Sequence, residues 1–317
     1  MAYSPVAAGT CFRHVGFFYR TETDYAATVA EFLRAALAAG EAAFAAVSPA
    51  KASLIRDTLG PDARYIEFAD MTTLGRNPAR IIPQVLAFIV GHAGHVRYVG
   101  EPIWAARNPA ELREATKHEA LVNLAFAQAD AEILCPYDTA ELDPAVIADA
   151  RRTHPLLLSS GVHLMSPEYT GPSDLLPSRS LPLPAPTGDA MNHTYRTDLS
   201  QVRALVLQHA REAGLSESRS NDLVLAVSEV AANTLRHTKS SGTLTLWRDE
   251  DEVVAEIHDE GMITDPLVGR HRPPPDASGG HGLWLVHQVC DLVELHSDAD
   301  GTTIRMHMAI QPAEMNG

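Results

Sequence analysis

Six of the 21 prolines fall in one short stretch that runs from Pro167 to Pro186. Neither helical nor strand periodicity continues through it, and a proline-rich segment of this kind acts as a semi-rigid spacer. The 317 residues are enough for two domains that each bury a core. The sequence therefore predicts an N-terminal domain over residues 1–166, a linker over 167–192 and a C-terminal domain over 193–317.

Before the linker, apolar runs of strand length alternate with helical patterns. The apolar runs are not interleaved with polar residues, which is typical of strands buried on both faces. Several helical patterns begin with proline, a residue favoured at the first helical position. This alternation predicts an α/β domain with a parallel sheet. The expected strands are Ala42–Val47, Tyr65–Phe68, Val96–Val99 and Ile133–Leu134, and the expected helices are Thr23–Ala39, Pro49–Leu59, Pro78–His92 and Pro109–Gln128.

After the linker the order of the elements changes. Two helical patterns, Leu199–Ala213 and Ser218–His237, precede two adjacent strands, Leu244–Arg248 and Val253–His258. A loop rich in proline and glycine, a helix over Gly282–Val289 and two closing strands complete the chain. Because strands follow one another directly, we expect a mixed or antiparallel sheet with helices on one face.

Charge and hydropathy limit the classes of partner. The 40 acidic and 25 basic residues give a formal net charge of −15. We therefore expect a surface that repels phosphate backbones and anionic lipid, with neither direct nucleic-acid binding nor membrane binding. The first residues lack a basic segment followed by an apolar run, and the longest apolar stretch, near residues 81–90, is too short to span a bilayer. These features predict a cytoplasmic protein.

Cysteine and histidine usage gives no metal-site pattern. Cys11, Cys135 and Cys290 are odd in number and follow no metal-ligand spacing, so we interpret them as packing residues in a reducing compartment. Two short histidine motifs, at residues 92–95 and 118–119, lack the partners that a zinc site requires.

Polar residues interrupt the predicted helix over 218–237. Glu229, Asn233 and His237 follow one another at steps of four residues, so they share one face of the helix. Taken alone, such a stripe is more simply explained as a solvated face. Two further segments of the C-terminal domain favour a binding site instead.

These two segments each combine glycine with a group that can bind a nucleotide. Asp259 ends a predicted strand just before Gly261, so its carboxylate can bond an exocyclic amine while the backbone approaches a base closely. Gly279, Gly280 and Gly282 run directly into a helix whose N-terminal amides favour phosphate. A lone Gly-x-Gly is more often a hinge. Here, however, three weak signals follow one another along the chain: Glu-x-x-x-Asn on a helix, Asp-x-Gly after a strand, and Gly-x-Gly at the start of a helix.

In this order the residues resemble the ATP-binding domain of the GHKL superfamily, and more specifically its anti-sigma-factor serine kinase branch. The segments VSEVAANTLRHT and GHGLWLVHQVCDLVELHSDADGTTIRMHM carry the resemblance, which covers about residues 195–310 without a long insertion. The resemblance implies a Bergerat-type α+β sandwich that binds ATP and Mg²⁺. It also implies that Asn233 ligates the magnesium ion, that Glu229 is the general base for the incoming hydroxyl and that Asp259 binds the adenine amine. The remaining nucleotide-binding residues that it implies are His237, Gly261, Arg270, Arg272, Gly280, Gly282, Leu283 and Thr302.

The chemistry of these residue types agrees with the implied roles. A hard magnesium ion prefers an oxygen ligand such as the Asn233 amide, and a carboxylate one helical turn away can accept a hydroxyl proton. The loop over 265–279 would be a lid over the phosphates. His237 either faces the triphosphate or interacts with the C-terminal end of its helix.

The sequence departs from the family pattern at one position and excludes one family branch. Ile263 stands where a second glycine is common, which would stiffen the lid or weaken nucleotide binding. No histidine lies in a dimerising helical hairpin with the phosphoacceptor setting of a two-component histidine kinase.

The N-terminal segments HVGFFYRTETDY, FADMTTLGRNPARIIPQVLAFI, VRYVGEPIWAAR, HEALVNLAFA, LCPYD and RRTHP resemble the MEDS sensory domain. This resemblance covers about residues 14–166 and implies a RecA-like α/β fold. The expected first strand is followed by SPAK, so a phosphate-binding loop is missing and we expect no ATP hydrolysis in this domain.

Ligands of open parallel sheets bind beyond the carboxyl ends of the strands. Residues at those ends, and in the segment that follows the third strand, are therefore candidates for contacting a sensed ligand. A structural role is an equal alternative, in which Glu101 pairs with Arg97 or Arg107 and Trp104 belongs to the core. The candidates are Ser48, Asp70, Glu101, Trp104, Arg107, Tyr137 and Asp138.

These features together predict a cytoplasmic switch protein. Its MEDS-like domain would sense a signal, and its C-terminal domain would bind Mg-ATP, sequester a sigma factor and phosphorylate Ser or Thr of an anti-anti-sigma (STAS-type) antagonist. Dimerisation through the ATP domain is common in that kinase family, so a homodimer fits the same prediction. The alternatives are a non-catalytic adaptor with a degenerate nucleotide site, and a sensor whose ligand changes only its oligomeric state.

Overall fold

The computed structural model of this chain describes residues 12–179, 182–238, 240–274, 276–277 and 279–310. The chain divides into two compact units, Met1–Arg179 and Ser180–Gly317. Within the described ranges, no helix combines the length and the apolar character that are needed to cross a membrane.

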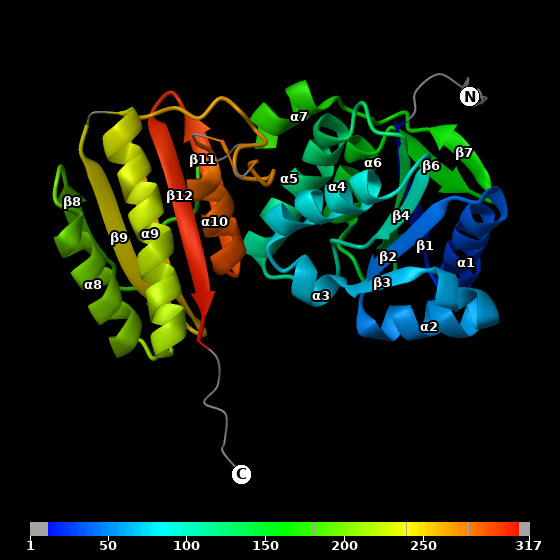
Figure 1. Cartoon of the computed structure of the whole chain (residues 1–317), viewed down its shortest axis with the longest axis horizontal. Coiled ribbons are helices and arrows are strands. Elements are labelled where there is room, and N and C mark those ends of the chain that lie inside the picture. The colour runs from blue at the N-terminus through cyan, green and yellow to red at the C-terminus, as the bar shows by residue number, and fades with distance from the viewer. Residues whose placement is uncertain (1–11, 180–181, 239, 275, 278, 311–317) are drawn as a thin grey trace, which may run out of the picture. The chain divides into compact units, whose positions relative to one another are not determined.

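A seven-stranded sheet forms the centre of the N-terminal unit, with the order β3-β2-β4-β5-β1-β6-β7 (Figure 1). The strand pairs are parallel except for the edge pair of β6 and β7. The predicted mostly parallel α/β sheet is therefore confirmed. The strands are β1 (Phe12–Tyr19), β2 (Ala42–Val47), β3 (Glu67–Asp70), β4 (Val96–Gly100), β5 (Ala131–Asp138), β6 (Leu156–Ser159) and β7 (Val162–Met165). The helices are α1 (Glu22–Ala39), α2 (Pro49–Leu59), α3 (Met71–Leu74), α4 (Ile81–Gly91), α5 (Pro109–Ala125), α6 (Pro144–Thr153) and α7 (Pro172–Arg179), with 3-10 turns η1 (Gly60–Tyr65) and η2 (Pro78–Arg80).

Helices cover both faces of this sheet. On one face, Val29 of α1 and Ile55 of α2 join a buried cluster with Val15 of β1. On the other face, the ring of Phe44 in β2 meets that of Phe88 in α4, with 5.1 Å between the ring centroids. The strands between the two layers are mostly buried, but the edge strand β3 is partly exposed, against the expectation of burial on both faces.

The helix boundaries follow local sequence signals. Ser48 precedes α2 and its Oγ accepts a hydrogen bond from the backbone N–H of Lys51 (3.4 Å). Asn108 and Glu111 form a capping box at the start of α5. Gly40 ends α1 with φ of 72°, a conformation that favours glycine. These signals explain why the predicted helices agree with α1, α2 and α5 to within a few residues.

The expected set of strands omitted β1, which lies in the middle of the sheet. The segment after the first strand is therefore Arg20–Thr21, and SPAK follows the second strand instead. The two residues between β1 and α1 are too short for a glycine-rich phosphate-binding loop. The segment after the first strand therefore has no phosphate-binding loop. This segment is Arg20–Thr21 and not SPAK, on which the expectation was based. The strands β6 and β7 and the helix α6 were also not expected.

Part of the segment expected to be a linker is helical. Pro172 occupies the first position of α7, where proline is tolerated, and the side chain of Leu175 is buried. The helix packs against α5 and α6, so the N-terminal unit extends to Arg179. Burial of this apolar side chain outweighs the helix-breaking tendency that the prolines suggested.

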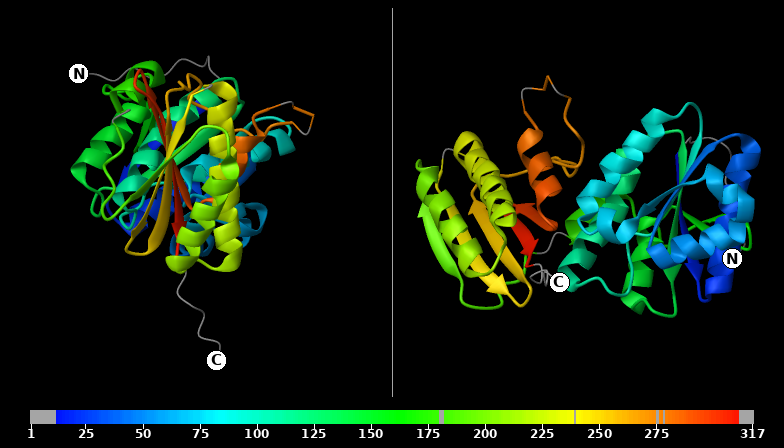
Figure 2. Two further views of the ribbon diagram at one scale, coloured as in Figure 1. Left: turned by 90° about the vertical axis from the view of Figure 1, so that its left-hand side faces the viewer. Right: turned by 60° about the horizontal axis from the view of Figure 1, so that its bottom comes forward.

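The C-terminal unit contains a five-stranded antiparallel sheet with the order β11-β12-β10-β9-β8. Its helices α8, α9 and α10 pack on one face of the sheet (Figure 2). Of the two expected alternatives, a mixed or an antiparallel sheet, the structure has the antiparallel one, and the expected placement of the helices on one face is confirmed. The strands are β8 (Met191–Tyr195), β9 (Gly242–Asp249), β10 (Glu252–Asp259), β11 (Leu292–Asp298) and β12 (Gly301–Ala309), and the helices are α8 (Leu199–Glu212), α9 (Glu217–His237) and α10 (His281–Val289).

The face of this sheet that points away from the helices carries a ladder of charged side chains. His307 of β12 lies between Glu252 (2.8 Å) and Glu294 (3.1 Å), and Arg305 pairs with Glu256 (2.6 Å). Burial alone would lower the pKa of His307, but its hydrogen bonds to the two carboxylates outweigh this effect and raise the pKa to about 9.

Candidate functional site

The polar face of α9 carries three of the predicted nucleotide-site residues. Glu229 and Asn233 are half-buried, whereas His237 is exposed at the last residue of the helix. The amide oxygen Oδ1 of Asn233 accepts a hydrogen bond from Arg236 (3.0 Å). The opposite face of α9 enters the core through Leu223, among others. The helix is thus held by its apolar face, and Glu229 and Asn233 lie on the other side.

Asp259 ends β10 next to α9. Its Oδ2 accepts a hydrogen bond from the hydroxyl of Thr234 (2.6 Å), and its Oδ1 accepts one from the backbone N–H of Gly261 (2.8 Å). The phenol of Tyr195 in turn donates to Thr234 (3.2 Å). These bonds orient the carboxylate, and each oxygen retains a lone pair for a further donor such as an exocyclic amine.

Sequence reasoning missed Thr234 and Tyr195. The sequence did offer one signal for Thr234. It is a hydroxyl residue directly after Asn233, on the face of α9 that otherwise carries apolar core residues such as Val230 and Ala231. A buried threonine in a helix needs a partner for its hydroxyl, and Asp259 provides it.

A second network holds the backbone around Gly261. The hydroxyl of Thr302 in β12 donates to the carbonyl of Gly261 (2.8 Å) and contacts Ser297 Oγ at 2.8 Å. Ser297 accepts a hydrogen bond from the backbone N–H of Ile263 (2.9 Å). Ile263, the residue that departs from the family pattern, packs its side chain against the core. The backbone of the loop after β10 is therefore held at Gly261 and at Ile263.

The start of α10 lies against α9. A Cβ added to Gly282 would lie 3.0 Å from Glu229 Oε2 and 3.3 Å from Asn233 Nδ2. The residue before the helix, Gly280, has φ of 88° and no side chain to cap the first N–H groups of α10. Leu283 is buried in the core of the unit. Glycine at position 282 thus keeps a small space open between the helix start and the two polar side chains.

The expected lid, residues 265–279, has no helix or strand in its described part. Its two arginines lie in different surroundings. The side chain of Arg270 is buried, whereas Arg272 is exposed, with its guanidinium carbon 5.8 Å from the centroid of the Trp284 ring. Both remain predicted contacts of the phosphates.

These residues have the chemistry that Mg-ATP requires. The space beside Gly282 adjoins an amide oxygen, which is a hard ligand suitable for magnesium, and a carboxylate that can accept a proton. The uncapped N–H groups at the start of α10 are donors for phosphate oxygens. Asn233 would hold the metal ion, and the metal ion would neutralise charge on the phosphates when bound.

In the N-terminal unit, the parallel strands β2, β3, β4 and β5 end at the same edge of the sheet, and five of the predicted sensory residues lie at or directly after these ends: Ser48, Asp70, Glu101, Tyr137 and Asp138. Glu101, directly after β4, is buried and contacts Lys51 of α2 and the phenol of Tyr19 (3.3 Å for the latter). Burial raises the pKa of Glu101 to about 7, and the contact with Lys51 acts in the opposite direction. The expected pairing of Glu101 with Arg97 or Arg107 was wrong. Arg97 pairs with Glu41, and the guanidinium of Arg107 donates to backbone carbonyls.

Sequence reasoning also missed Lys51. Its ammonium lies 5.0 Å from the ring centroids of both Tyr19 and Tyr25, besides its contact with Glu101. Ser48 and Asp70 cap α2 and α3, respectively, so their side chains bond backbone N–H groups at the same edge.

The remaining sensory candidates have partners within the domain. The guanidinium of Arg107 is buried and donates to the carbonyls of Pro102 (2.5 Å) and Gly75 (2.5 Å), and it lies 3.8 Å from the Trp104 ring centroid. Burial lowers the pKa of Arg107 to about 10. Trp104 itself is only half-buried. These contacts fix the segment after β4 and leave the indole partly accessible.

The end of β5 carries the last two candidates. Tyr137 is buried, with its ring 5.5 Å from that of Phe18 and 5.5 Å from that of His154 between centroids. Asp138 accepts a hydrogen bond from the backbone N–H of Ala140 (2.8 Å). Tyr137 therefore faces the interior of the domain rather than the outer edge of the sheet.

Comparison with protein families identifies two regions of the chain. Residues 13–155 match the family described as MEDS: MEthanogen/methylotroph, DcmR Sensory domain. Residues 193–308 match the histidine kinase-like ATPase domain. A search of the curated proteins gives no match.

Proposed function

We propose that this chain, which joins a MEDS domain to a histidine kinase-like ATPase domain, is a signal-responsive anti-sigma regulator. Its C-terminal domain binds Mg-ATP, sequesters a sigma factor and phosphorylates Ser or Thr of an anti-anti-sigma (STAS-type) antagonist. Its MEDS domain senses the signal. Within this proposal the two units adopt the RecA-like and Bergerat-type folds, and the functional domains span residues 1–166 and 193–317.

The observation that carries the proposal is the close approach of α10 to α9. A Cβ at position 282 would lie only 3.0 Å from Glu229 and 3.3 Å from Asn233, so a phosphate at the start of α10 would lie next to both side chains. Asp259 holds its carboxylate as an acceptor at the end of the neighbouring strand. A base-binding carboxylate, a phosphate-binding helix start and a metal-binding amide thus belong to one side of one domain.

The side chains support a phosphotransfer mechanism that depends on positioning. Asn233 presents an amide oxygen to the metal ion, and the N–H groups of α10 bind phosphate oxygens. Glu229, one helical turn before Asn233, accepts the proton of the incoming hydroxyl. Phosphoryl transfer requires alignment and charge neutralisation more than covalent chemistry, so these groups suffice for the reaction.

Binding is tested first, by calorimetric titration of the full chain with ATP in the presence and absence of Mg²⁺. Asn233→Ala is expected to remove the dependence on magnesium, and Asp259→Asn to weaken ATP but not pyrophosphate. Asn192→Ala, in the exposed part of β8 of the same domain, is the matched control and is expected to bind as the wild type does. Failure of the wild type to bind Mg-ATP would overturn the proposal.

Transfer is tested second, with γ-labelled ATP and each STAS-type protein encoded in the same genome. We expect acid-stable label on serine or threonine of one of them, lost in Glu229→Gln while Mg-ATP binding is retained. Mg-ATP binding without transfer to any of these proteins would favour the non-catalytic adaptor instead. Co-purification of a sigma factor with the full chain tests the remaining part of the proposal.

A further inference from the structure

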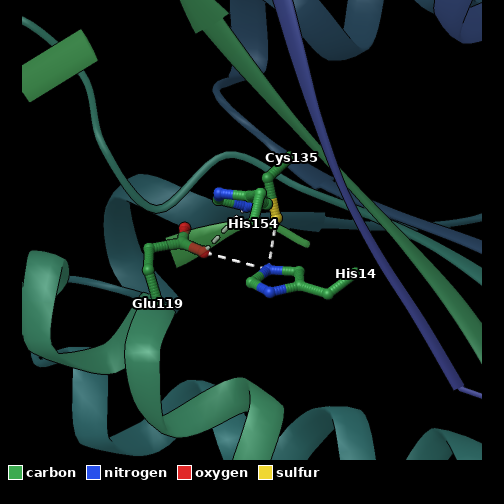
Figure 3. Close-up of side chains that lie close together, drawn as sticks. All are labelled: His14, Glu119, Cys135 and His154. Atoms are coloured by element: carbon green, nitrogen blue, oxygen red, sulfur yellow. Dashed lines mark hydrogen bonds and ion pairs between the residues drawn. The ribbon is translucent and has the colours of Figure 1, made fainter. Parts of the chain in front are cut away.

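Four polar side chains meet in the interior of the N-terminal domain. They are His14 of β1, Glu119 of α5, Cys135 of β5 and His154, the residue after α6. All four are at most 3% exposed, and one nitrogen, oxygen or sulfur atom of each lies within 4.8 Å of the others. Figure 3 shows the side chains pointing toward one another. Sequence spacing gave no sign of this cluster, because its members come from four separate segments.

The hydrogen-bond partners of His14 fix which of its nitrogens faces the cluster. Its Nδ1 lies 3.2 Å from Oδ1 of Asn123. The amide nitrogen of Asn123 is already committed to the carbonyl of Thr153 (2.8 Å), so its oxygen must face His14. Nδ1 of His14 is therefore the donor, and Nε2 faces Glu119 Oε2 (3.1 Å) with a lone pair when the ring is neutral.

The same argument applies to His154. Its Nδ1 lies 2.7 Å from the carbonyl of Ala150, which can only accept, so Nδ1 carries the proton. Its Nε2 lies 3.3 Å from Glu119 Oε2 and has no hydrogen-bond partner among the described residues. Such an arrangement, with Nδ1 bonded to a backbone or amide oxygen and Nε2 facing inward, is typical of metal-ligating histidines.

The protons in the cluster are too few for the acceptors. With both imidazole rings neutral, Nε2 of His14, Nε2 of His154 and the carboxylate of Glu119 are acceptors, and the thiol of Cys135, 3.4 Å from His14 Nε2, offers one proton. Lone pairs that face a buried carboxylate without a cation between them repel one another. A positive charge at the centre of the cluster would remove this repulsion.

We propose that His14, Glu119, Cys135 and His154 form a binding site for one divalent transition-metal ion, for which zinc is the best match. Tetrahedral zinc with its usual bond lengths places nitrogen and oxygen ligands about 3.3 Å apart, and sulfur and nitrogen ligands about 3.6 Å apart. Three of the six separations, 3.1, 3.3 and 3.4 Å, are close to these values, and all six are within 4.8 Å. Two neutral imidazoles, one carboxylate and one thiolate also balance the charge of a divalent ion.

The ion would connect elements that are far apart in the sequence. It joins two neighbouring strands, β1 and β5, to α5 and to the end of α6. A small cavity, with room for about one water molecule, borders Glu119 and Cys135 and is otherwise lined mainly by apolar side chains such as Met71 and Val85.

The test uses the full chain without an affinity tag. Because the ligands are buried, the ion is taken up as the domain folds, so protein unfolded with a chelator is refolded with Zn²⁺ or with Co²⁺. We expect one tightly held ion per chain, and with cobalt a thiolate charge-transfer absorption together with the d–d bands of a tetrahedral site. Cys135→Ser is expected to lose the charge-transfer absorption. Cys290→Ser, which changes the buried cysteine of the other domain, is the matched control and is expected to retain it.

A measurement on the wild type keeps the test independent of whether a variant folds. X-ray absorption of the zinc-loaded chain is expected to show one sulfur at about 2.3 Å and nitrogen or oxygen ligands at about 2.0 Å. The proposal is overturned if refolded wild type holds no ion, if the spectra show no sulfur ligand, or if Cys290→Ser loses the cobalt signal while Cys135→Ser retains it. In those cases the cluster is held by protons alone.

Discussion

Gly282→Ala separates the folding role of α10 from its proposed role in nucleotide binding. In helices, alanine is more favourable than glycine by roughly 1 kcal/mol, so the substitution by itself should not lower stability. The added Cβ would, however, lie 3.0 Å from Glu229 Oε2, about 0.4 Å closer than the 3.4 Å at which ordinary contacts begin. The carboxylate is the end of a flexible side chain and can move away by a few tenths of an ångström. The fold is therefore preserved while the geometry of Glu229 and Asn233 changes.

We expect Gly282→Ala to unfold at the temperature of the wild type or slightly above it, and to bind Mg-ATP about tenfold more weakly, a change of about 1.4 kcal/mol. Calorimetric titration with Mg-ATP and thermal unfolding of the same sample measure both quantities. Gly91→Ala is the matched control, because Gly91 ends α4 and an added Cβ there meets nothing within 4 Å. Unchanged Mg-ATP affinity in a folded Gly282→Ala protein would refute the placement of the nucleotide beside Gly282.

Two further predictions concern stability. The pKa of His307 is raised from 6.5 to about 9, so the proton that it holds between Glu252 and Glu294 stabilises the folded state below pH 6.5, and this stabilisation is lost as the pH rises toward 9. Urea unfolding should show a loss of at most about 3 kcal/mol over this interval, and His307→Gln should remove the dependence. Asn108→Ala removes the capping box that Asn108 forms with Glu111, and should lower the free energy of unfolding by about 1 kcal/mol in the same assay.

Local signals predicted the C-terminal helices well and missed a central strand. The helix α9 was expected over 218–237 and spans Glu217–His237, because its apolar positions recur with helical spacing and Ser216 caps its start. The strand β1 carries Arg13, His14 and Gly16 among its apolar residues, so it does not resemble a buried strand. His14 is nevertheless fully buried, because its polar atoms meet residues of α5 that lie more than a hundred positions away.

The same limit applies to the candidate sites. The sequence could predict that Glu229 and Asn233 share one face, because both lie on one helix. Their distance from Gly282 depends on how α10 packs against α9, which no local pattern contains. At the carboxyl ends of the parallel strands, charge alone suggested an arginine partner for Glu101. The topology supplies Lys51 instead, because α2 follows β2, the strand beside β4.

The acidity of the C-terminal domain has a consequence for how a nucleotide would reach it. Residues 193–317 carry 10 basic and 19 acidic residues, a net charge of −9, and Mg-ATP is itself an anion. The attraction that would hold phosphate in the proposed site is therefore local, from the start of α10 and from Arg270 and Arg272, whereas the field at longer range would repel it. Salt screens the long-range part first, since the Debye length is about 8 Å at physiological ionic strength.

We therefore expect the association rate of Mg-ATP to increase as the salt concentration rises, which is the reverse of a site surrounded by positive charge. Stopped-flow mixing with a fluorescent ATP analogue measures this rate, and a fluorescent adenosine analogue, which has no charge, is the control whose rate should not change. A rate that falls with salt for the ATP analogue alone would mean that basic groups dominate the field at the entrance. The acidic surface would then be irrelevant to the nucleotide, and its charge would have to act on another partner.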